Sequence, residues 1–314
     1  INELSRENNI IGTTKKGIGP AYEDKVGRRS IRLCDIHDYG LLEKKINDLI
    51  KFHQPRLTEY KKENNMTHVL KELFNLSKFL KDFSYPVWRL LNDLGEKDKF
   101  ILFEGAQGAL LDIDFGTYPF VTSSNTSSGQ IFSGSGFGIK HNHRVFGITK
   151  AYTTRVGSGP FPTELNDNIA EHLGEKGQEY GTVTRRKRRC GWFDANLVKQ
   201  SVKISGITDI VLTKLDILDE LDFIQVCVGY ILNDKKYDYL PFNELDQSKI
   251  KPIYEKIPGW KESTFGITKW SDLPINAKKY VLFLEELIDI KISIISTGPE
   301  RSQTIDKENI LGNI

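Results

Sequence analysis

The chain has 314 residues, 39% of them hydrophobic, and a formal net charge of only +2 from 44 basic and 42 acidic side chains. No stretch approaches the roughly 20 apolar residues of a membrane span, which predicts a protein without a membrane partner. Three widely spaced cysteines, an odd number, argue against a disulfide framework and favour a reducing, cytoplasmic compartment.

Residues 10–29 are dense in glycine, threonine and basic side chains. Glycine lets backbone amides approach a ligand closely, and threonine hydroxyls add donors to phosphate. A phosphate-binding segment and an ordinary surface loop fit this composition equally well. The chain contains no GxxxxGK[ST] pattern, so a Walker-type loop is excluded from these residues.

A helical region is predicted from about residue 41 to 93. Leu42, Ile46 and Leu49 recur at helical spacing, as do Leu70 and Leu73 further along. Such apolar stripes are typical of a core, so we interpret the region as scaffold.

The apolar run 100–104 and the glycine turn 105–108 predict a strand that ends in a tight turn. Ligands gather at the carboxyl ends of strands in open α/β sheets, which puts the Gln107 amide within reach of a substrate. The alternative is a turn residue that faces water. Residues 145–153 predict a second strand.

Five cationic side chains stand in a row at residues 185–189, between threonines and a Cys-Gly-Trp sequence. Nothing nearby in sequence is expected to neutralise them, and the planar arginine fork suits phosphate and carboxylate. The run is therefore a candidate anion site. A solvated surface run or a localisation signal is the alternative.

Residues 209–216 form an apolar strand that ends in Thr-Lys-Leu-Asp, similar to the guanine-reading [NT]KxD element of GTP-binding proteins. A carboxylate accepts hydrogen bonds from guanine N1–H and the exocyclic amine, which adenine does not offer. Residues 291–299 repeat the plan of a strand followed by a small-residue loop. Helices are predicted over 194–204 and 276–288, and a hairpin over 223–240.

Taken together, these segments resemble the adenylosuccinate synthetase family over essentially the whole chain. The resemblance implies an α/β fold with a P-loop-NTPase-like, mostly parallel central sheet, flanking helices and a helical insertion near residues 41–97, all in a single domain over 1–314. The motifs that carry it are residues 17–28, 103–108, 117–119, 121–126, 154–157, 159–164, 213–216, 258–260 and 295–299.

The resemblance implies a ligase of purine biosynthesis that joins IMP to L-aspartate, driven by GTP hydrolysis with Mg²⁺. GTP phosphorylates the 6-oxygen of IMP, and the aspartate amine then displaces phosphate. It also implies a homodimer.

The resemblance further assigns site residues. Lys25, in a family signature, and Gln107 are assigned to catalysis. The IMP set is Thr14, Gln107, Thr122, Arg186 and, from the partner subunit, Arg28. The aspartate set is Thr182, Val183, Thr184, Arg185, Arg186, Lys187 and Arg188. The GTP set is Arg188, Lys214, Leu215, Asp216, Ser296, Thr297 and Gly298.

The sequence also departs from the family pattern. The signature Gln-Trp-Gly-Asp-Glu-Gly-Lys-Gly is absent, and with it the phosphate loop, the catalytic base, the metal ligand and the histidine acid that follows it. We therefore interpret the chain, which begins at Ile1, as the C-terminal three quarters of the enzyme, inactive alone and without a metal ligand of its own. Val183 and Arg185 stand where the family often has threonine and glycine.

Two other classes of function remain. One is a non-catalytic remnant that binds guanine nucleotide. The other is a nucleic-acid binder that uses the basic run, which ranks last because only Trp192 offers a stacking aromatic beside it. We therefore expect no nucleic-acid partner.

Overall fold

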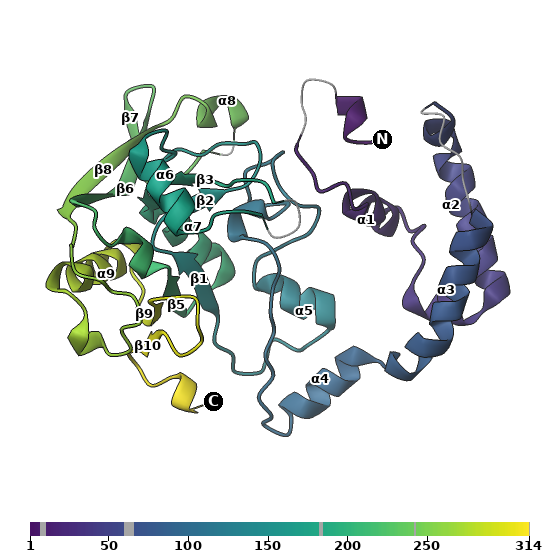
Figure 1. The fold of residues 1–314 in the computed structure, drawn as a ribbon. Helices are drawn as coiled ribbons and strands as arrows, with labels where there is room; N and C mark the ends of the chain where they lie inside the picture. Colours follow the sequence, from purple (N-terminus) through teal and green to yellow (C-terminus); the bar gives the residue numbers. More distant parts are fainter. Residues whose placement is uncertain (7–10, 60–65, 182–184, 242, 314) are drawn as a thin grey trace. The chain divides into compact units, whose positions relative to one another are not determined.

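The computed structural model describes residues 1–6, 11–59, 66–181, 185–241 and 243–313, which form two compact units (Figure 1). The first unit is Ile1–Ile101, Thr122–Ser124 and Ser133–Gly138. The second is Leu102–Val121, Asn125–Phe132 and Ile139–Ile314. The single domain expected over 1–314 stays a prediction, because compactness within each unit does not test it.

The first unit is helical, as the apolar spacing of residues 41–93 predicts. Leu42, Ile46 and Leu70 are buried and pack with Ile36 in a small core of this unit. Its helices are η1 (Leu4–Arg6), α1 (Ile18–Val26), η2 (Leu33–His37), α2 (Tyr39–Glu59), α3 (Met66–Leu80), η3 (Lys81–Phe83) and α4 (Val87–Gly95).

The second unit is built on a mostly parallel sheet with strand order β1-β5-β9-β10 (Figure 1). The strands are β1 (Phe146–Lys150), β5 (Asp209–Thr213), β9 (Ile292–Ser296) and β10 (Thr304–Asp306). β1, β5 and β9 pair in parallel, and β10 is antiparallel to β9. Continuous apolar runs are typical of parallel strands covered on both faces. The predicted α/β class with flanking helices is confirmed.

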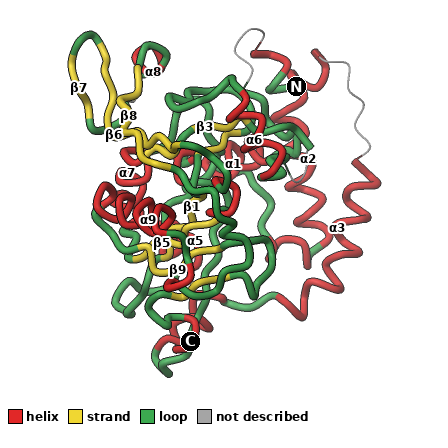
Figure 2. Tube along the Cα trace, turned by 60° about the vertical axis from the view of Figure 1, so that its left-hand side comes forward, coloured by secondary structure: helices red, strands yellow, loops and turns green. Residues whose placement is uncertain are grey.

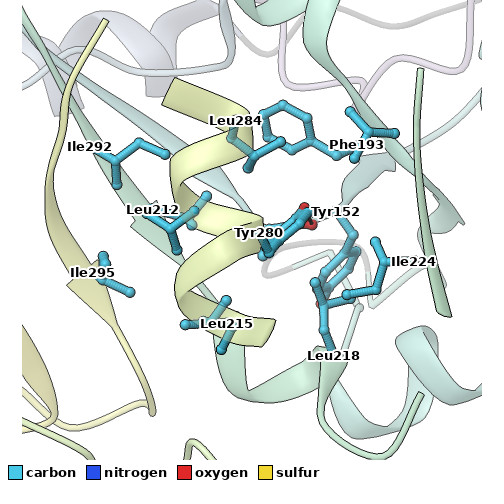
Figure 3. Packing of buried hydrophobic residues seen from close by; sticks show 14 of the residues in the cluster. Tyr152, Phe193, Leu212, Leu215, Leu218, Ile224, Tyr280, Leu284, Ile292 and Ile295 are labelled. Carbon is cyan, nitrogen blue, oxygen red and sulfur yellow. Dashed lines mark hydrogen bonds between the residues drawn. The ribbon is translucent and has the colours of Figure 1, made fainter. Parts of the chain in front are cut away.

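Helix α9 (Ile275–Ile288) packs against this sheet, as its amphipathic sequence predicts. Figure 3 shows Tyr280 and Leu284 of α9 among the side chains of the largest core. Tyr280 is fully buried, and its hydroxyl donates to the Ala151 carbonyl at 2.6 Å, so the phenol carries no unsatisfied polar group into the core.

Two smaller sheets complete the second unit (Figure 2). β2 (Thr153–Arg155) pairs with β3 (Arg189–Gly191). The other sheet contains β4 (Phe193–Asp194), β6 (Phe223–Leu232), β7 (Lys235–Tyr237) and β8 (Lys251–Pro258), and β6 with β7 forms the predicted hairpin. The remaining elements are η4 (Ala109–Leu111), α5 (Gly129–Ser135), α6 (Asn168–Lys176), α7 (Ala195–Ser205), η5 (Leu215–Leu218), α8 (Glu244–Gln247), η6 (Trp270–Asp272) and η7 (Leu311–Asn313).

The strand predicted over residues 100–104 is wrong. These residues belong to no strand, and the side chains of Phe100 and Leu102 are 80% and 90% exposed. An apolar run becomes a strand only where a neighbour shares its hydrogen-bond ladder, and none of the strands described here pairs with it. Among the helices of the described residues, none is long and apolar enough to cross a membrane.

Helix α7 begins at a buried carboxylate, as predicted for Asp194. The Asp194 carboxylate accepts from the Leu197 amide at 3.2 Å and from the Tyr230 hydroxyl at 2.8 Å. Burial raises the pKa of Asp194 to about 6, although these hydrogen bonds oppose the shift.

We expect this carboxyl group to make stability depend on pH. The pKa of about 6 in the folded chain lies above the ordinary 3.8, so the stabilising contribution is complete below pH 4 and is lost as pH rises through 6. The free energy of unfolding should fall by about 3 kcal/mol between pH 4 and 7, relative to Asp194→Asn, which does not titrate. Urea unfolding of both proteins across this range checks it, and parallel pH profiles would contradict it.

Candidate functional site

The basic run at residues 185–189 leads into β3, and its last two cations, Arg188 and Arg189, form ion pairs within the chain. Arg188 Nη1 lies 2.8 Å from Glu179 Oε2, and Arg189 Nε lies 2.7 Å from Glu164 Oε1. Our expectation that no nearby group neutralises the run is therefore wrong for Arg188 and Arg189. The reason is that the chain folds back on itself, so that Glu179 and Glu164 lie beside the run.

Glu179 is the centre of a set of side chains that we call the Glu179 cluster: Glu179, Lys150, Tyr152, Arg188 and Lys214. Oε1 accepts from the Tyr152 hydroxyl at 2.7 Å and from Lys214 Nζ at 2.8 Å. Oε2 accepts from Lys150 Nζ and Arg188 Nη1, both at 2.8 Å. Burial alone would raise the pKa of Glu179, but these four donors hold it at about 2. The carboxylate is therefore ionised at neutral pH.

Backbone pairing joins the residues on the two sides of the basic loop. Tyr180 and Lys187 form an antiparallel bridge, and the Gly181 amide donates to the Arg186 carbonyl at 2.8 Å. Arg185 adopts a left-handed conformation with φ of 53°, at the position where the family often has glycine. The predicted aspartate residues Thr182, Val183 and Thr184 lie outside the described residues.

The predicted guanine element lies at the carboxyl end of β5. Lys214 turns the chain with φ of 62°, and η5 follows with Leu215 and Asp216 buried. Asp216 is 8% exposed, and among the described residues no basic group lies within ion-pair distance of it. Burial is the largest cause that raises the pKa of this carboxyl, and the nearby charge of Asp219 adds to it. The charges of Lys176 and Lys214 lower this pKa, but neither side chain forms an ion pair with the Asp216 carboxyl, which is therefore suited to a ligand that donates hydrogen bonds.

The second part of the predicted GTP set follows β9, the parallel neighbour of β5. Leu212 pairs with Ile295, so the carboxyl ends of the two strands lie side by side. The structure thus brings Asp216 and the segment Ser296, Thr297 and Gly298 to one edge of the sheet. A Cβ on Gly298 would lie 2.3 Å from Gln303 Oε1, so a side chain there requires Gln303 to move.

A second buried carboxylate, that of Asp219, connects the loop segments beside this edge of the sheet. Asp219 accepts from Trp260 Nε1 at 2.6 Å and from the Thr264 amide at 2.8 Å. Thr297 Oγ1 in turn donates to the Ile267 carbonyl at 2.8 Å. The Pro-Gly-Trp motif that ends at Trp260 is therefore tied to the loop beyond β9.

The predicted IMP and catalytic residues fall in both units. Thr14, Lys25, Arg28 and Thr122 belong to the first unit, and Gln107 and Arg186 belong to the second. All except the half-buried Thr122 are exposed, and Gln107 lies in the predicted tight turn with φ of 65°. Their roles toward IMP stay predictions.

Backbone amides of the glycine-rich segment already hold a carboxylate. Glu3 Oε1 accepts from the Gly12 amide at 2.6 Å and from the Thr13 amide at 3.1 Å. The amides of Gly12 and Thr13 are therefore occupied by a carboxylate of the chain itself.

Sequence reasoning missed Lys150, Tyr152 and Glu179. Lys150 ends β1, so the rule that ligands gather at the carboxyl ends of parallel strands would have singled it out. Glu179 lies six positions before the basic run, and no local pattern marks it. Its role depends on segments that meet only in the folded chain.

A mostly parallel sheet with a buried carboxylate and a cationic cluster at its carboxyl edge is typical of nucleotide-binding α/β proteins. The family model for adenylosuccinate synthetase matches residues 1–305. The chain belongs to the adenylosuccinate synthetase family, ligases of purine biosynthesis that join IMP and aspartate.

A solved structure of the same family agrees with this assignment. The fully ligated adenylosuccinate synthetase from Plasmodium falciparum is 39% identical, with a TM-score of 0.92, and the match covers 98% of this chain and 73% of that chain. The succinoaminodeoxyadenylate synthetase of cyanophage S-2L, bound to dGMP and dATP, is 18% identical with a TM-score of 0.45, over 70% of this chain and 50% of that chain, and carries no argument here. The family match begins at residue 1 and gives no support to our interpretation of the chain as a C-terminal three quarters.

The family implies Mg²⁺, and we tested whether the described residues can hold it. Among them, no group of three or more His, Cys, Asp and Glu side chains has the geometry of a metal site. Mg²⁺ usually keeps several waters and phosphate oxygens and needs only one or two protein carboxylates, so no ligand set is assigned to it here.

The left-handed Arg185 leads to a prediction about the loop. A non-glycine residue in this conformation destabilises the folded chain by roughly 1–2 kcal/mol. Glycine removes this strain but has more conformational entropy in the unfolded chain, which offsets part of the gain. We expect Arg185→Gly to leave stability unchanged or raise it by up to about 1 kcal/mol, measured by urea unfolding. Lys187→Gly is the matched control, because Lys187 has no positive φ and should only lose stability. Equal losses in both variants would contradict the interpretation.

Proposed function

We propose that this chain binds GTP, IMP and L-aspartate and contributes to the GTP-dependent synthesis of adenylosuccinate, with release of GDP and phosphate. The observation that carries the proposal is the buried Asp216 carboxylate at the carboxyl end of β5, beside the loop that follows β9. This group lies where a base would be read, and no basic side chain of the described residues forms an ion pair with it, although the charges of Lys176 and Lys214 act on it.

In this proposal the guanine base lies between the ends of β5 and β9. Asp216 accepts hydrogen bonds from N1–H and the exocyclic amine, which adenine does not provide. The backbone of residues 296–298, which carry small side chains, closes over the base. Lys214 and Leu215 form the turn beneath it.

The basic loop is proposed to bind aspartate through residues 182–188. Arg188 faces both the loop and the GTP site, because its guanidinium belongs to the Glu179 cluster. Arg185, Arg186 and Lys187 are exposed and would present their charges to the dicarboxylate, while Arg188 and Arg189 also contact carboxylates of the chain itself. This partial neutralisation also disfavours the nucleic-acid binder, which needs an open basic face.

IMP is proposed to contact Thr14, Gln107, Thr122 and Arg186, with Arg28 supplied by the partner subunit of a cytoplasmic homodimer. The γ-phosphoryl group of GTP passes to the 6-oxygen of IMP. The aspartate amine then attacks carbon 6, and phosphate leaves with that oxygen. Gln107 and Lys25 would orient the reacting groups, and no base or acid is assigned among the described residues.

Catalysis by the 314-residue chain alone is a separate question. The family signature Gln-Trp-Gly-Asp-Glu-Gly-Lys-Gly does not occur in its sequence, and phosphoryl transfer depends on charge positioned around the γ-phosphate. We therefore expect no adenylosuccinate from purified chain with GTP, IMP, aspartate and Mg²⁺, followed by chromatography. Product formation would overturn this expectation, whereas guanine binding without turnover would fit the non-catalytic remnant equally well.

Base recognition is tested by Asp216→Asn. The amide presents a donor to the donors of guanine, and an unmatched buried hydrogen bond costs roughly 1–3 kcal/mol, so GDP affinity should fall about 5- to 150-fold. The affinity for xanthosine diphosphate, which has an oxygen at carbon 2, should fall less than the affinity for GDP. Calorimetric titration of the 314-residue chain measures both affinities. Asp222→Asn, a change at an exposed carboxylate, is the control and should bind GDP as before. Unchanged GDP affinity in Asp216→Asn would mean that residues 213–216 are only a strand end.

A further inference from the structure

The Glu179 carboxylate joins the basic loop to the guanine element. One oxygen accepts from Arg188, in the basic run, and the other accepts from Lys214, in the turn after β5. The backbone strengthens both links, because the Arg188 amide donates to the Glu179 carbonyl at 2.8 Å and Lys214 Nζ also donates to the Gly177 carbonyl. A short segment, residues 177–179, therefore holds a group from each of two proposed binding elements.

The charges of the Glu179 cluster are not balanced. Glu179 is fully buried, while the side chains of Lys150, Arg188 and Lys214 remain 24%, 27% and 32% exposed. Three cations face one carboxylate, so a formal excess of two positive charges borders solvent. A buried carboxylate is stable only while donors surround it, and the loss of one donor increases its dependence on the others.

We propose that Glu179 is a positioning residue that couples nucleotide at the guanine site to the conformation of the basic loop. The proposal rests on the guanine site proposed above. When Lys214 donates to the nucleotide, the Glu179 carboxylate is held more strongly by Arg188 and Lys150, and Arg188 is fixed. Residues 185–188 are then held in place for an anionic ligand. By linkage, a ligand in the loop strengthens nucleotide binding by the same factor.

A purely structural role makes a different prediction. A buried carboxylate that only supports the fold would, when replaced, lower stability and loop order alike, with or without nucleotide. Coupling instead means that the effect of nucleotide on the loop depends on Glu179. The basic run itself supplies the readout, because trypsin cleaves after Lys and Arg.

The experiment compares tryptic cleavage after Lys187 and Arg188 with and without saturating GDP, measured by mass spectrometry. In the 314-residue chain we expect GDP to slow cleavage at least about fivefold, the lower end of usual coupling between sites. In Glu179→Gln, at a GDP concentration that calorimetry shows to be saturating, the two rates should become nearly equal. Glu179→Asp keeps the charge but is one methylene too short to span both partners, and should show an intermediate ratio.

Glu164→Gln is the matched control. It removes the partner of Arg189 in the same basic run but does not touch Lys214, so protection by GDP should persist. If thermal melting shows that Glu179→Gln does not fold, Glu179→Asp carries the test. If GDP protected the unmodified chain and both Glu179 variants equally, the coupling would be overturned but the guanine site would stand. GDP binding without any protection of the unmodified chain would have the same meaning. Absence of GDP binding to the unmodified chain would overturn the guanine site itself.

Discussion

A single buried carboxylate organises the functional edge of the second unit. Glu179 is ionised and fully buried, and such a group is stable only if several donors reach it. Its donors come from the end of β1, from Tyr152, from the basic run and from the turn after β5. Satisfying one charge therefore fixes the relative positions of segments that lie far apart in the sequence.

Other loops of this unit are held in the same way. Asp219 accepts from Trp260 and Thr264, and Asp112 accepts from the amides of Asp114, at 3.0 Å, and Thr126. Loop amides have no ladder or helix to bond them, and buried ones need acceptors. Buried carboxylates supply these acceptors here, so the loops are hydrogen-bonded without additional regular structure.

Local patterns account for much of what sequence could predict. The helices of the first unit follow from apolar spacing, and α7 begins at Asp194 because a carboxylate caps a helix through the amide of Leu197. The strand over residues 100–104 shows the limit of such reasoning. Its apolar run is local, but a strand also needs a neighbour, and a pattern within one segment does not reveal which segments pair.

The sequence by itself determined the family, the Thr-Lys-Leu-Asp pattern at residues 213–216 and the presence of a cationic loop, because each is a property of consecutive residues. Only the tertiary structure decided that Arg188 and Arg189 are neutralised internally, and that Lys150, Tyr152 and Lys214 share one carboxylate. The physical reason is that an ion pair acts over a few ångströms of space and not over a fixed number of residues. The strand order β1-β5-β9 brings these groups within that distance, and no single segment of the chain contains all of them.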